Sequence, residues 1–230
     1  MDADSSPLFR LDGVTCTHQE GQAPVLADLS LALKPGECIG IVGKNGSGKS
    51  TLLHIGAGLI TPERGRVLFN EKECLNEADF AEARKGLGYL LQHAEDQLFC
   101  TTVLEDVAFG PYNLGYSEAR AEDMARAALA DLSLSHLADR NGQRLSGGEQ
   151  KLAALASILV MDVDMLFLDE PTNDLDEGAR EMLMNVLERF RLPSLVVSHD
   201  LPFLRGLCTR FCRLENGTLT DLPAPPSCCR

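Results

Sequence analysis

The chain contains the sequence Gly43-Lys44-Asn45-Gly46-Ser47-Gly48-Lys49-Ser50, which fits the pattern GxxxxGK followed by Ser or Thr. An apolar run from Cys38 to Val42 precedes it, and apolar residues typical of a helix follow it. A strand, a glycine-rich turn and a helix in this order form a cradle, because consecutive backbone N–H groups and the helix N-terminus face one anion. The stretch predicts a phosphate-binding loop rather than a merely flexible glycine turn.

The loop also indicates the class of ligand. Lys49 is placed to reach the β- and γ-phosphates of a nucleotide, and the Ser50 hydroxyl is placed to hold Mg²⁺. The residues that we expect to bind the nucleotide here are Gly43, Lys44, Asn45, Gly46, Ser47, Gly48, Lys49, Ser50 and Thr51.

Length and charge limit the remaining possibilities. With 230 residues the chain is expected to form one domain with an inserted lobe. The net charge of −13 disfavours nucleic acid as a partner, because binding a phosphate backbone needs a concentrated basic face. No apolar run approaches the ~20 residues of a membrane span, and the first residues are acidic, unlike a signal peptide. We therefore expect a soluble, cytosolic chain.

The eight cysteines do not form a metal-binding or redox pattern. Four are scattered, and Cys208 and Cys212 lack the two-residue spacer of zinc ribbons. The pair Cys228-Cys229 follows a proline-rich stretch at the end of the chain. We expect reduced thiols and an unstructured tail over residues 223–230.

The hydrophobic pattern predicts an α/β fold in three parts. Residues 8–16 and 25–33 indicate an N-terminal antiparallel β part, and residues 66–69 and 88–91 indicate further strands. From Ala121, apolar residues recur at helical spacing in a helix that begins near Ser117, so a helical subdomain is expected at about 93–160. The rest, about 1–92 and 161–222, forms the core of a single domain.

The second half of the core has the pattern of a parallel sheet. Continuous apolar runs at residues 165–168 and 195–197 enclose a helical stretch at 177–190, which is a β-α-β order. Near the end, Asn216-Gly217 separates two short strand-like runs and predicts a two-residue hairpin. The predicted fold is a P-loop NTPase core with a parallel sheet, an N-terminal antiparallel β part and an inserted helical subdomain.

Two carboxylates, Asp169 and Glu170, stand at the end of a predicted strand, and Pro171 ends its hydrogen-bond ladder. Ligands of such sheets bind at this edge, where the phosphate loop also opens. Asp169 is then placed to bind Mg²⁺, and Glu170 to accept a proton from an attacking water molecule. Successive strand residues face opposite ways, so both serve one site only if the backbone turns at Glu170. The alternative is a solvated acidic loop.

A second anion site is predicted at residues 145–150, which read LSGGEQ. Ser146 and Glu149 form an S-x-x-E capping box at the start of an apolar helical pattern. Plain helix capping would explain these two residues. The adjacent glycines Gly147 and Gly148 additionally leave backbone N–H groups bare at the positive end of a helix.

Together with the phosphate loop, Gln92 and His199, the LSGGEQ sequence resembles the nucleotide-binding subunit of ABC transporters over residues 8–220. The resemblance implies ATP and Mg²⁺ as ligands and ATP hydrolysis coupled to transport. In that family, the LSGGEQ segment of one subunit closes over ATP bound to its partner. A head-to-tail dimer, a homodimer in our interpretation, is therefore implied.

The resemblance assigns further roles residue by residue. Gln92 contacts Mg²⁺ or water at the hinge of the helical lobe, His199 contacts the γ-phosphate, and residues 173–176 face the partner. His18 stands nearest to the position at which relatives stack an aromatic residue on adenine, which implies weaker adenine binding. The implied nucleotide contacts from the second subunit are Ser146, Gly147, Gly148, Glu149 and Gln150.

Residues 92–115 are, more narrowly, similar to the ATPase subunits of energy-coupling-factor importers, particularly the cobalt and nickel group. In these proteins the stretch lies where a membrane subunit docks, which implies an integral membrane partner and a peripheral location on the cytoplasmic side of the membrane. The apolar residues of this stretch fit either the lobe core or a partner groove, and they are Leu98, Phe99, Val103, Val107 and Phe109.

Three classes of function remain to be weighed: an importer ATPase, a soluble ABC ATPase and a small-molecule kinase. A cobalt or nickel importer is preferred, with a vitamin importer next, and neither follows from the chemistry of a residue. A soluble ABC ATPase of DNA repair or translation is disfavoured, because the chain has no long coiled coil, tandem cassette or basic surface. A small-molecule kinase would have no use for LSGGEQ.

Overall fold

The computed structural model describes residues 6–17 and 23–223. Its N-terminal part is an antiparallel sheet in the order β2-β1-β4-β5. The strands are β1 (Phe9–Cys16), β2 (Leu26–Leu33), β4 (Arg64–Phe69) and β5 (Lys72–Glu73). Apolar residues alternate along β1 and β2, so one face of this sheet is buried against the rest of the chain.

The central sheet has the order β10-β9-β3-β8-β7-β6. Its strands are β3 (Cys38–Val42), β6 (Leu87–Leu90), β7 (Met165–Asp169), β8 (Ser194–Val197), β9 (Arg210–Glu215) and β10 (Thr218–Leu222). All pairs are parallel except β9 with β10, which form the hairpin that Asn216-Gly217 predicts. Residues Ile41 and Asp169 both pair with Val197, so the carboxyl ends of β3 and β7 meet at one edge.

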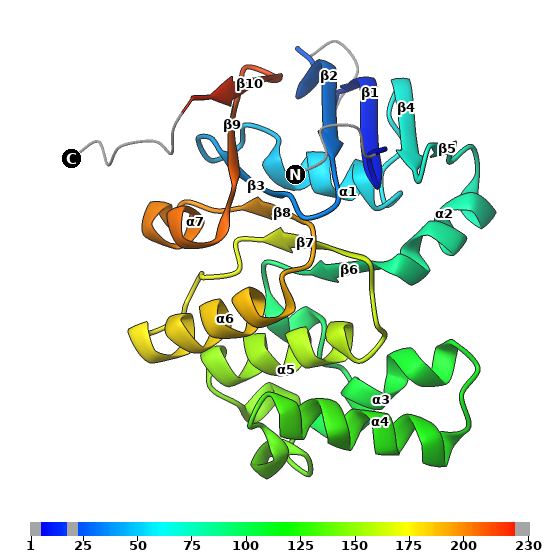
Figure 1. Cartoon of the computed structure of the whole chain (residues 1–230), viewed down its shortest axis with the longest axis vertical. Coiled ribbons are helices and arrows are strands. Elements are labelled where there is room, and N and C mark those ends of the chain that lie inside the picture. Colours follow the sequence, from blue (N-terminus) through cyan, green and yellow to red (C-terminus); the bar gives the residue numbers. More distant parts are fainter. Residues whose placement is uncertain (1–5, 18–22, 224–230) are drawn as a thin grey trace.

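Helices cover both faces of the central sheet, as Figure 1 shows. Helix α1 (Lys49–Gly56) lies between the two sheets, while α5 (Gly147–Leu159) and α6 (Glu177–Phe190) lie on the opposite face. Helices α3 (Val103–Asn113) and α4 (Glu118–Asp131) pack on the outer side of α5. Shorter helices are α2 (Glu77–Ala83) and α7 (Leu201–Leu207), with 3-10 turns at Arg84–Gly86, Ala94–Asp96, Ser135–Leu137 and Gly142–Arg144.

The central sheet separates two apolar clusters. One cluster contains the buried residues of the N-terminal sheet and α1, and the other contains those of α3 to α7. Strand β7 contributes Phe167 to the first cluster, whereas its neighbours Leu166 and Leu168 belong to the second. This alternation follows from strand geometry, in which successive side chains point to opposite faces.

The predicted fold class is confirmed, and the predicted elements differ from the structure mainly at their ends. Helix α6 has the predicted bounds, and Ser117 is the N-cap of α4, with its side chain accepting a hydrogen bond from Arg120 N. Strand β4 begins two residues earlier than predicted, at Arg64, because backbone pairing of Arg64 with Thr15 extends it where the side chains are exposed. Helices α3, α4 and α5 all lie within residues 93–160, the range predicted for the helical lobe.

Some predictions fall outside the described residues. These are the adenine-stacking position His18, the tail from residue 224 onward and the pair Cys228-Cys229. Among the residues that are described, no helix combines the length and the apolar character that crossing a bilayer requires.

Candidate functional site: a phosphate loop beside two buried carboxylates

The phosphate loop needs glycine at two positions for steric reasons. Gly48 adopts φ 98°, a left-handed conformation that side chains rarely allow. A Cβ atom at Gly43 would lie 2.4 Å from the Leu214 carbonyl oxygen and 2.6 Å from Ser47 Oγ. The loop is therefore held against β9, and α1 begins directly after it, with Gly48 as an N-cap that has no side chain to cover the first N–H groups.

Lys49 turns its ammonium group into the loop. Its Nζ donates hydrogen bonds to the carbonyl oxygens of Gly43 and Lys44, at 3.0 and 3.2 Å, and lies 3.3 Å from His199 Nε2. Burial lowers the pKa of this ammonium, while the negative charges of Glu170 and Asp169 act in the opposite direction. A buried cation beside bare N–H groups is the arrangement that binds a phosphate anion.

Asp169 lies at the end of β7, with only 3% of its surface exposed. Its Oδ1 has no hydrogen-bond partner among the described residues, although it is buried. Burial raises the pKa of the carboxyl group, and a hydrogen bond from Ser50 partly offsets this effect. A buried carboxylate oxygen that lacks a donor, beside a serine hydroxyl, fits a Mg²⁺ ion, because oxygen atoms are the ligands this ion takes.

The backbone turns at Glu170, as the sequence requires if both carboxylates are to serve one site. Glu170 has φ 45°, in the left-handed region. Its Oε1 lies 3.2 Å from His199 Nε2, and its Oε2 accepts a hydrogen bond from His199 N at 3.1 Å. Burial raises the pKa of this carboxyl group, and the neighbouring His199 acts in the opposite direction. A raised pKa suits a group that accepts a proton during a reaction.

Lys49, Ser50, Glu170 and His199 line one cavity of about 480 Å³, and Asp169 is not part of its lining. Its lining joins the loop, the end of β7 and two predicted contacts, Gln92 and His199, and also includes Asn173 of the stretch expected to face a partner. The full lining is Asn45, Gly46, Gly48, Lys49, Ser50, Thr51, Gln92, Glu170, Asn173 and His199. The phosphate loop, the candidate base Glu170 and the predicted contacts Gln92 and His199 therefore line the same cavity.

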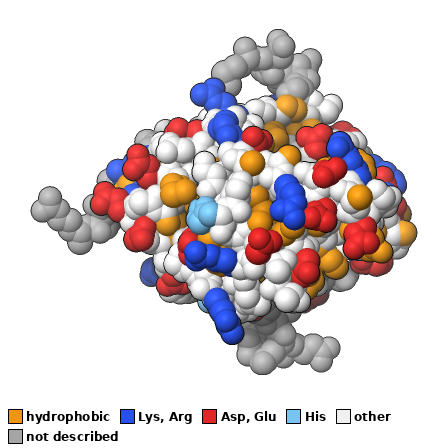
Figure 2. All heavy atoms as spheres, turned by 90° about the horizontal axis from the view of Figure 1, so that it is seen from below, with side chains coloured by type: hydrophobic (Ala, Val, Ile, Leu, Met, Phe, Trp, Pro, Cys, Tyr) orange, Lys and Arg blue, Asp and Glu red, His pale blue; other side chains and the backbone are white. Residues whose placement is uncertain are grey.

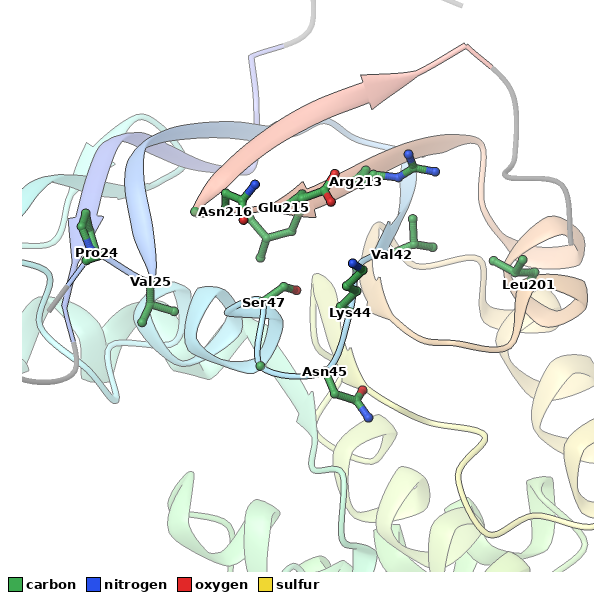
Figure 3. Close-up of a pocket in the computed structure, with 15 residues that line it drawn as sticks. Pro24, Val25, Val42, Lys44, Asn45, Ser47, Leu201, Arg213, Glu215 and Asn216 are labelled. Atoms are coloured by element: carbon green, nitrogen blue, oxygen red, sulfur yellow. The ribbon is translucent and has the colours of Figure 1, made fainter. Parts of the chain in front are cut away.

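A larger cavity, of about 810 Å³, lies on the other side of the loop (Figure 3). The hairpin residues Arg213, Glu215 and Asn216 lie along one wall, and Lys44 and Ser47 lie across from them. The hairpin therefore encloses the phosphate loop from outside, and its tip is fixed because Gly217 O accepts a hydrogen bond from Ala27 N at 2.9 Å.

The second predicted anion site forms as a complete capping box. Ser146 Oγ accepts a hydrogen bond from Glu149 N, and Glu149 Oε2 accepts one from Ser146 N at 2.9 Å. The hydrogen bonds that the Glu149 carboxylate accepts from Ser146 N and Ser146 Oγ lower the pKa of this carboxyl group. Of the residues described, none from Ser146 to Gln150 lines the cavity at the phosphate loop. Within one chain the two anion sites are separate.

Lys151 is a structural contact of this site that the sequence reasoning missed. Its side chain is 3% exposed, and Nζ donates hydrogen bonds to the carbonyl oxygens of Gln92 and Leu91, at 2.7 and 3.3 Å. Burial lowers the pKa of this lysine. In the sequence, the signal for this contact is the position of Lys151 between Gln150 and the apolar Leu152, where a lysine exposed to solvent is not expected. It ties the helix that follows LSGGEQ to the backbone of Gln92.

The apolar residues of the 92–115 stretch divide between the two roles considered for them. Leu98, Val103 and Val107 are buried in the lobe core, whereas the side chains of Phe99 and Phe109 are 63% and 44% exposed. The two phenylalanine rings contact each other edge to face, with centroids 5.0 Å apart. Asp106 accepts hydrogen bonds from Phe99 N and Cys100 N, which fixes the exposed pair on the surface.

Comparison with known proteins shows which proteins this chain resembles in sequence. The family model described as ABC transporter matches residues 26–173. A putative ABC transporter ATP-binding protein of Nitratidesulfovibrio vulgaris is 47% identical over 216 residues, covering 94% of this chain and 79% of the relative. The cobalt import ATP-binding protein CbiO of Rhodobacter capsulatus is 39% identical, covering 92% of this chain and 77% of the relative.

Solved structures resemble the chain over nearly its whole length. CbiO1 of Clostridium perfringens, described as part of the ABC transporter complex CbiONQ, is 28% identical with a TM-score of 0.82, covering 94% of this chain and 88% of the other. A dimeric post-hydrolysis state of the ATP-binding cassette MJ0796, bound to ADP and Pi, is 26% identical with a TM-score of 0.82, covering 94% and 99% of the two chains.

Proposed function

The chain belongs to the ABC transporter family of ATP-hydrolysing cassettes, and from this membership we propose that it drives a membrane importer of the energy-coupling-factor type, for cobalt or nickel ions. One observation carries the catalytic part of the proposal: Lys49, Glu170 and His199 line a single cavity next to the unpartnered oxygen of Asp169. The similarity to a cobalt import ATP-binding protein, CbiO, supports the choice of cobalt, and the similarity to CbiO1 supports a multi-subunit transporter complex.

In the proposed reaction, residues 43–51 hold the triphosphate of ATP, and Lys49 exchanges its loop carbonyl partners for the β- and γ-phosphates. Ser50, Asp169 and Gln92 would hold Mg²⁺, which supplies positive charge at the phosphates when bound. Glu170 accepts a proton from the water that attacks the γ-phosphorus, and the β–γ bridging oxygen leaves with ADP. His199 donates to the γ-phosphate while Glu170 Oε2 fixes its backbone N–H.

We further propose that a second copy of this chain completes each site in a head-to-tail dimer. The capping-box segment Ser146–Gln150 presents bare N–H groups, yet it lies away from the phosphate loop of its own chain. A partner related by two-fold symmetry brings this segment over the nucleotide. His18 remains our proposed adenine contact in that complex.

A membrane subunit is proposed to dock on the helical lobe. A surface cavity of about 630 Å³ joins the exposed Phe109 and Tyr112 to the carboxylates Glu105, Glu118 and Glu122. On the face in Figure 2, apolar side chains lie among both acidic and basic ones. An acidic, partly aromatic groove fits a basic amphipathic segment. The chain would then lie peripherally on the cytoplasmic side of the membrane, and its charge of −13 disfavours nucleic acid as a partner.

Replacing the proposed base tests the catalytic part. We expect Glu170→Gln to retain ATP binding and to lower the turnover number by about 10²-fold or more, because the amide cannot accept the proton from water. Steady-state phosphate release and equilibrium ATP binding measure the two effects. Glu181→Gln, an exposed change on α6, is the control. Turnover of Glu170→Gln at the parental rate would remove Glu170 from the mechanism.

Co-expression with a candidate membrane subunit tests the docking surface. We expect the double substitution Phe99→Ser, Phe109→Ser to abolish co-purification in detergent, because both exposed rings would be lost, while ATP hydrolysis by the isolated chain persists. Leu75→Ser is the matched control, since Leu75 is also exposed but precedes α2, outside the lobe. If the double variant co-purified with the membrane subunit as well as the parent does, the proposal that this surface is the docking site would be wrong.

A further inference from the structure

Both chain neighbours of His199 are held by side-chain contacts that the proposed reaction does not use. On one side, Ser198 is fully buried at the end of β8, and its Oγ lies 3.4 Å from Thr172 Oγ1. The same Oγ accepts a hydrogen bond from Asp200 N at 3.0 Å. The backbone on either side of His199 is thus fixed through one serine hydroxyl.

On the other side, the Asp200 carboxylate has two tasks. Oδ1 accepts a hydrogen bond from Phe203 N at 2.9 Å and thereby caps α7. The same carboxylate receives Arg180 of α6: Nη2 donates to Oδ1 at 3.0 Å, and Nε lies 2.6 Å from Oδ2. The arginine and aspartate side chains are 33% and 21% exposed, so solvent screens this pair only in part.

The other partners in these contacts, Thr172 and Arg180, lie on either side of the stretch proposed to face the second subunit. Thr172 immediately precedes residues 173–176. Arg180 lies in the first turn of α6, where its backbone N–H donates to Asp176 O at 3.0 Å. Residues 173–176 therefore lie between two anchors, and each anchor reaches a residue next to His199.

We propose that Arg180 is a positioning residue for His199, acting through Asp200, and that it couples residues 173–176 to the imidazole. The inference rests on the proposed function, in which His199 contacts the γ-phosphate and residues 173–176 contact the partner. One charge-assisted hydrogen bond, from Nη2, and the ion pair at Nε hold the guanidinium against the carboxylate, although Nε itself makes no hydrogen bond. When a second subunit displaces the start of α6, the displacement reaches Asp200 and alters the position of His199.

Steady-state kinetics of the intact chain test the proposal. We expect Arg180→Ala to lower kcat about tenfold while KM for ATP stays within about twofold, because the loop that binds ATP is untouched and a small misplacement of a catalytic contact costs rate. Arg180→Lys should have a kcat between those of Arg180→Ala and the parent, since an ammonium group keeps the charge but lacks the planar guanidinium. Arg189→Ala, which removes an arginine from the far end of the same helix, is the control and should keep the parental kcat.

A double-mutant cycle separates positioning from general stability. Asp200→Asn keeps an oxygen that can cap α7 but loses the charge that holds Arg180, so adding it to Arg180→Ala should lower kcat no further. All rates are measured well below the melting midpoint of each variant. Parental kcat in Arg180→Ala, an equal loss in Arg189→Ala, or fully additive losses in the cycle would each overturn the inference.

One additional variant distinguishes this inference from the proposed function beneath it. His199→Ala should lower turnover more than Arg180→Ala. Should His199→Ala hydrolyse ATP at the parental rate, the proposed role of His199 fails. Should His199→Ala be impaired while Arg180→Ala is not, only the positioning role of Arg180 fails.

Discussion

Glu170 combines an unusual backbone conformation with a buried acidic side chain. Its φ of 45° costs on the order of 1–3 kcal/mol for a residue other than glycine, and this turn is what directs a second carboxylate into the site. The sequence shows that both carboxylates can serve one site only if the backbone turns at Glu170, but it does not predict that the turn is present. The pairing of Arg180 with Asp200 had no sequence signal at all, because it joins residues that only the packing of α6 beside α7 brings together.

The raised pKa of Glu170 predicts how stability depends on pH. Because the folded-state pKa lies above the ordinary value, Glu170 favours folding when protonated, and this contribution is lost as the pH rises through the folded-state pKa. At pH 7.5 the unliganded Glu170→Gln variant should therefore melt at a higher temperature than the parent. The increase in melting temperature should be about 2–4 °C for each kcal/mol of unfolding free energy gained. Calorimetry from pH 7.5 downward should show the gap narrowing as the pH falls through the raised folded-state pKa, and closed once the pH is below the ordinary pKa of a glutamate. A gap independent of pH would contradict the assignment.

At the scale of elements, local patterns predicted most of the helices and strands. Caps and periodicity located the starts of α4 and α5, and continuous apolar runs located the buried strands β3, β7 and β8. Element ends were less well predicted where backbone pairing, rather than side-chain burial, extends a strand, as in β4. The exposure of Phe99 and Phe109 depended on tertiary packing and was not decided by their spacing.

The two serine caps provide a matched test of an element that has a second task. Ser146→Ala and Ser117→Ala each remove an N-cap hydrogen bond and should each cost about 1 kcal/mol of unfolding free energy. Only Ser146→Ala should also reduce ATP hydrolysis, because only α5 begins at the proposed seat for the partner's nucleotide. Denaturant melts and phosphate release measure the two effects. Equal rates of ATP hydrolysis by the two variants would show that the capping box has a structural role alone.

At the scale of the whole molecule, the proposed head-to-tail dimer explains why one chain carries two separate predicted anion sites. We expect Glu170→Gln with ATP to sediment as a dimer and the nucleotide-free form to sediment as a monomer, because the bound triphosphate joins the two surfaces. Adding Ser146→Arg should prevent the dimer without preventing ATP binding to the loop. A strictly monomeric ATP-bound Glu170→Gln, in solution and in lipid, would overturn the head-to-tail arrangement.

The division of the interior by the central sheet has an evolutionary consequence. Side chains of α1 pack in one apolar cluster with the N-terminal sheet, and those of α3 and α4 pack in the other, so substitutions in these two sets are separated by the sheet. Evolution can therefore change the lobe helices, on which a membrane subunit is proposed to dock, while the packing of α1 against the N-terminal sheet is kept.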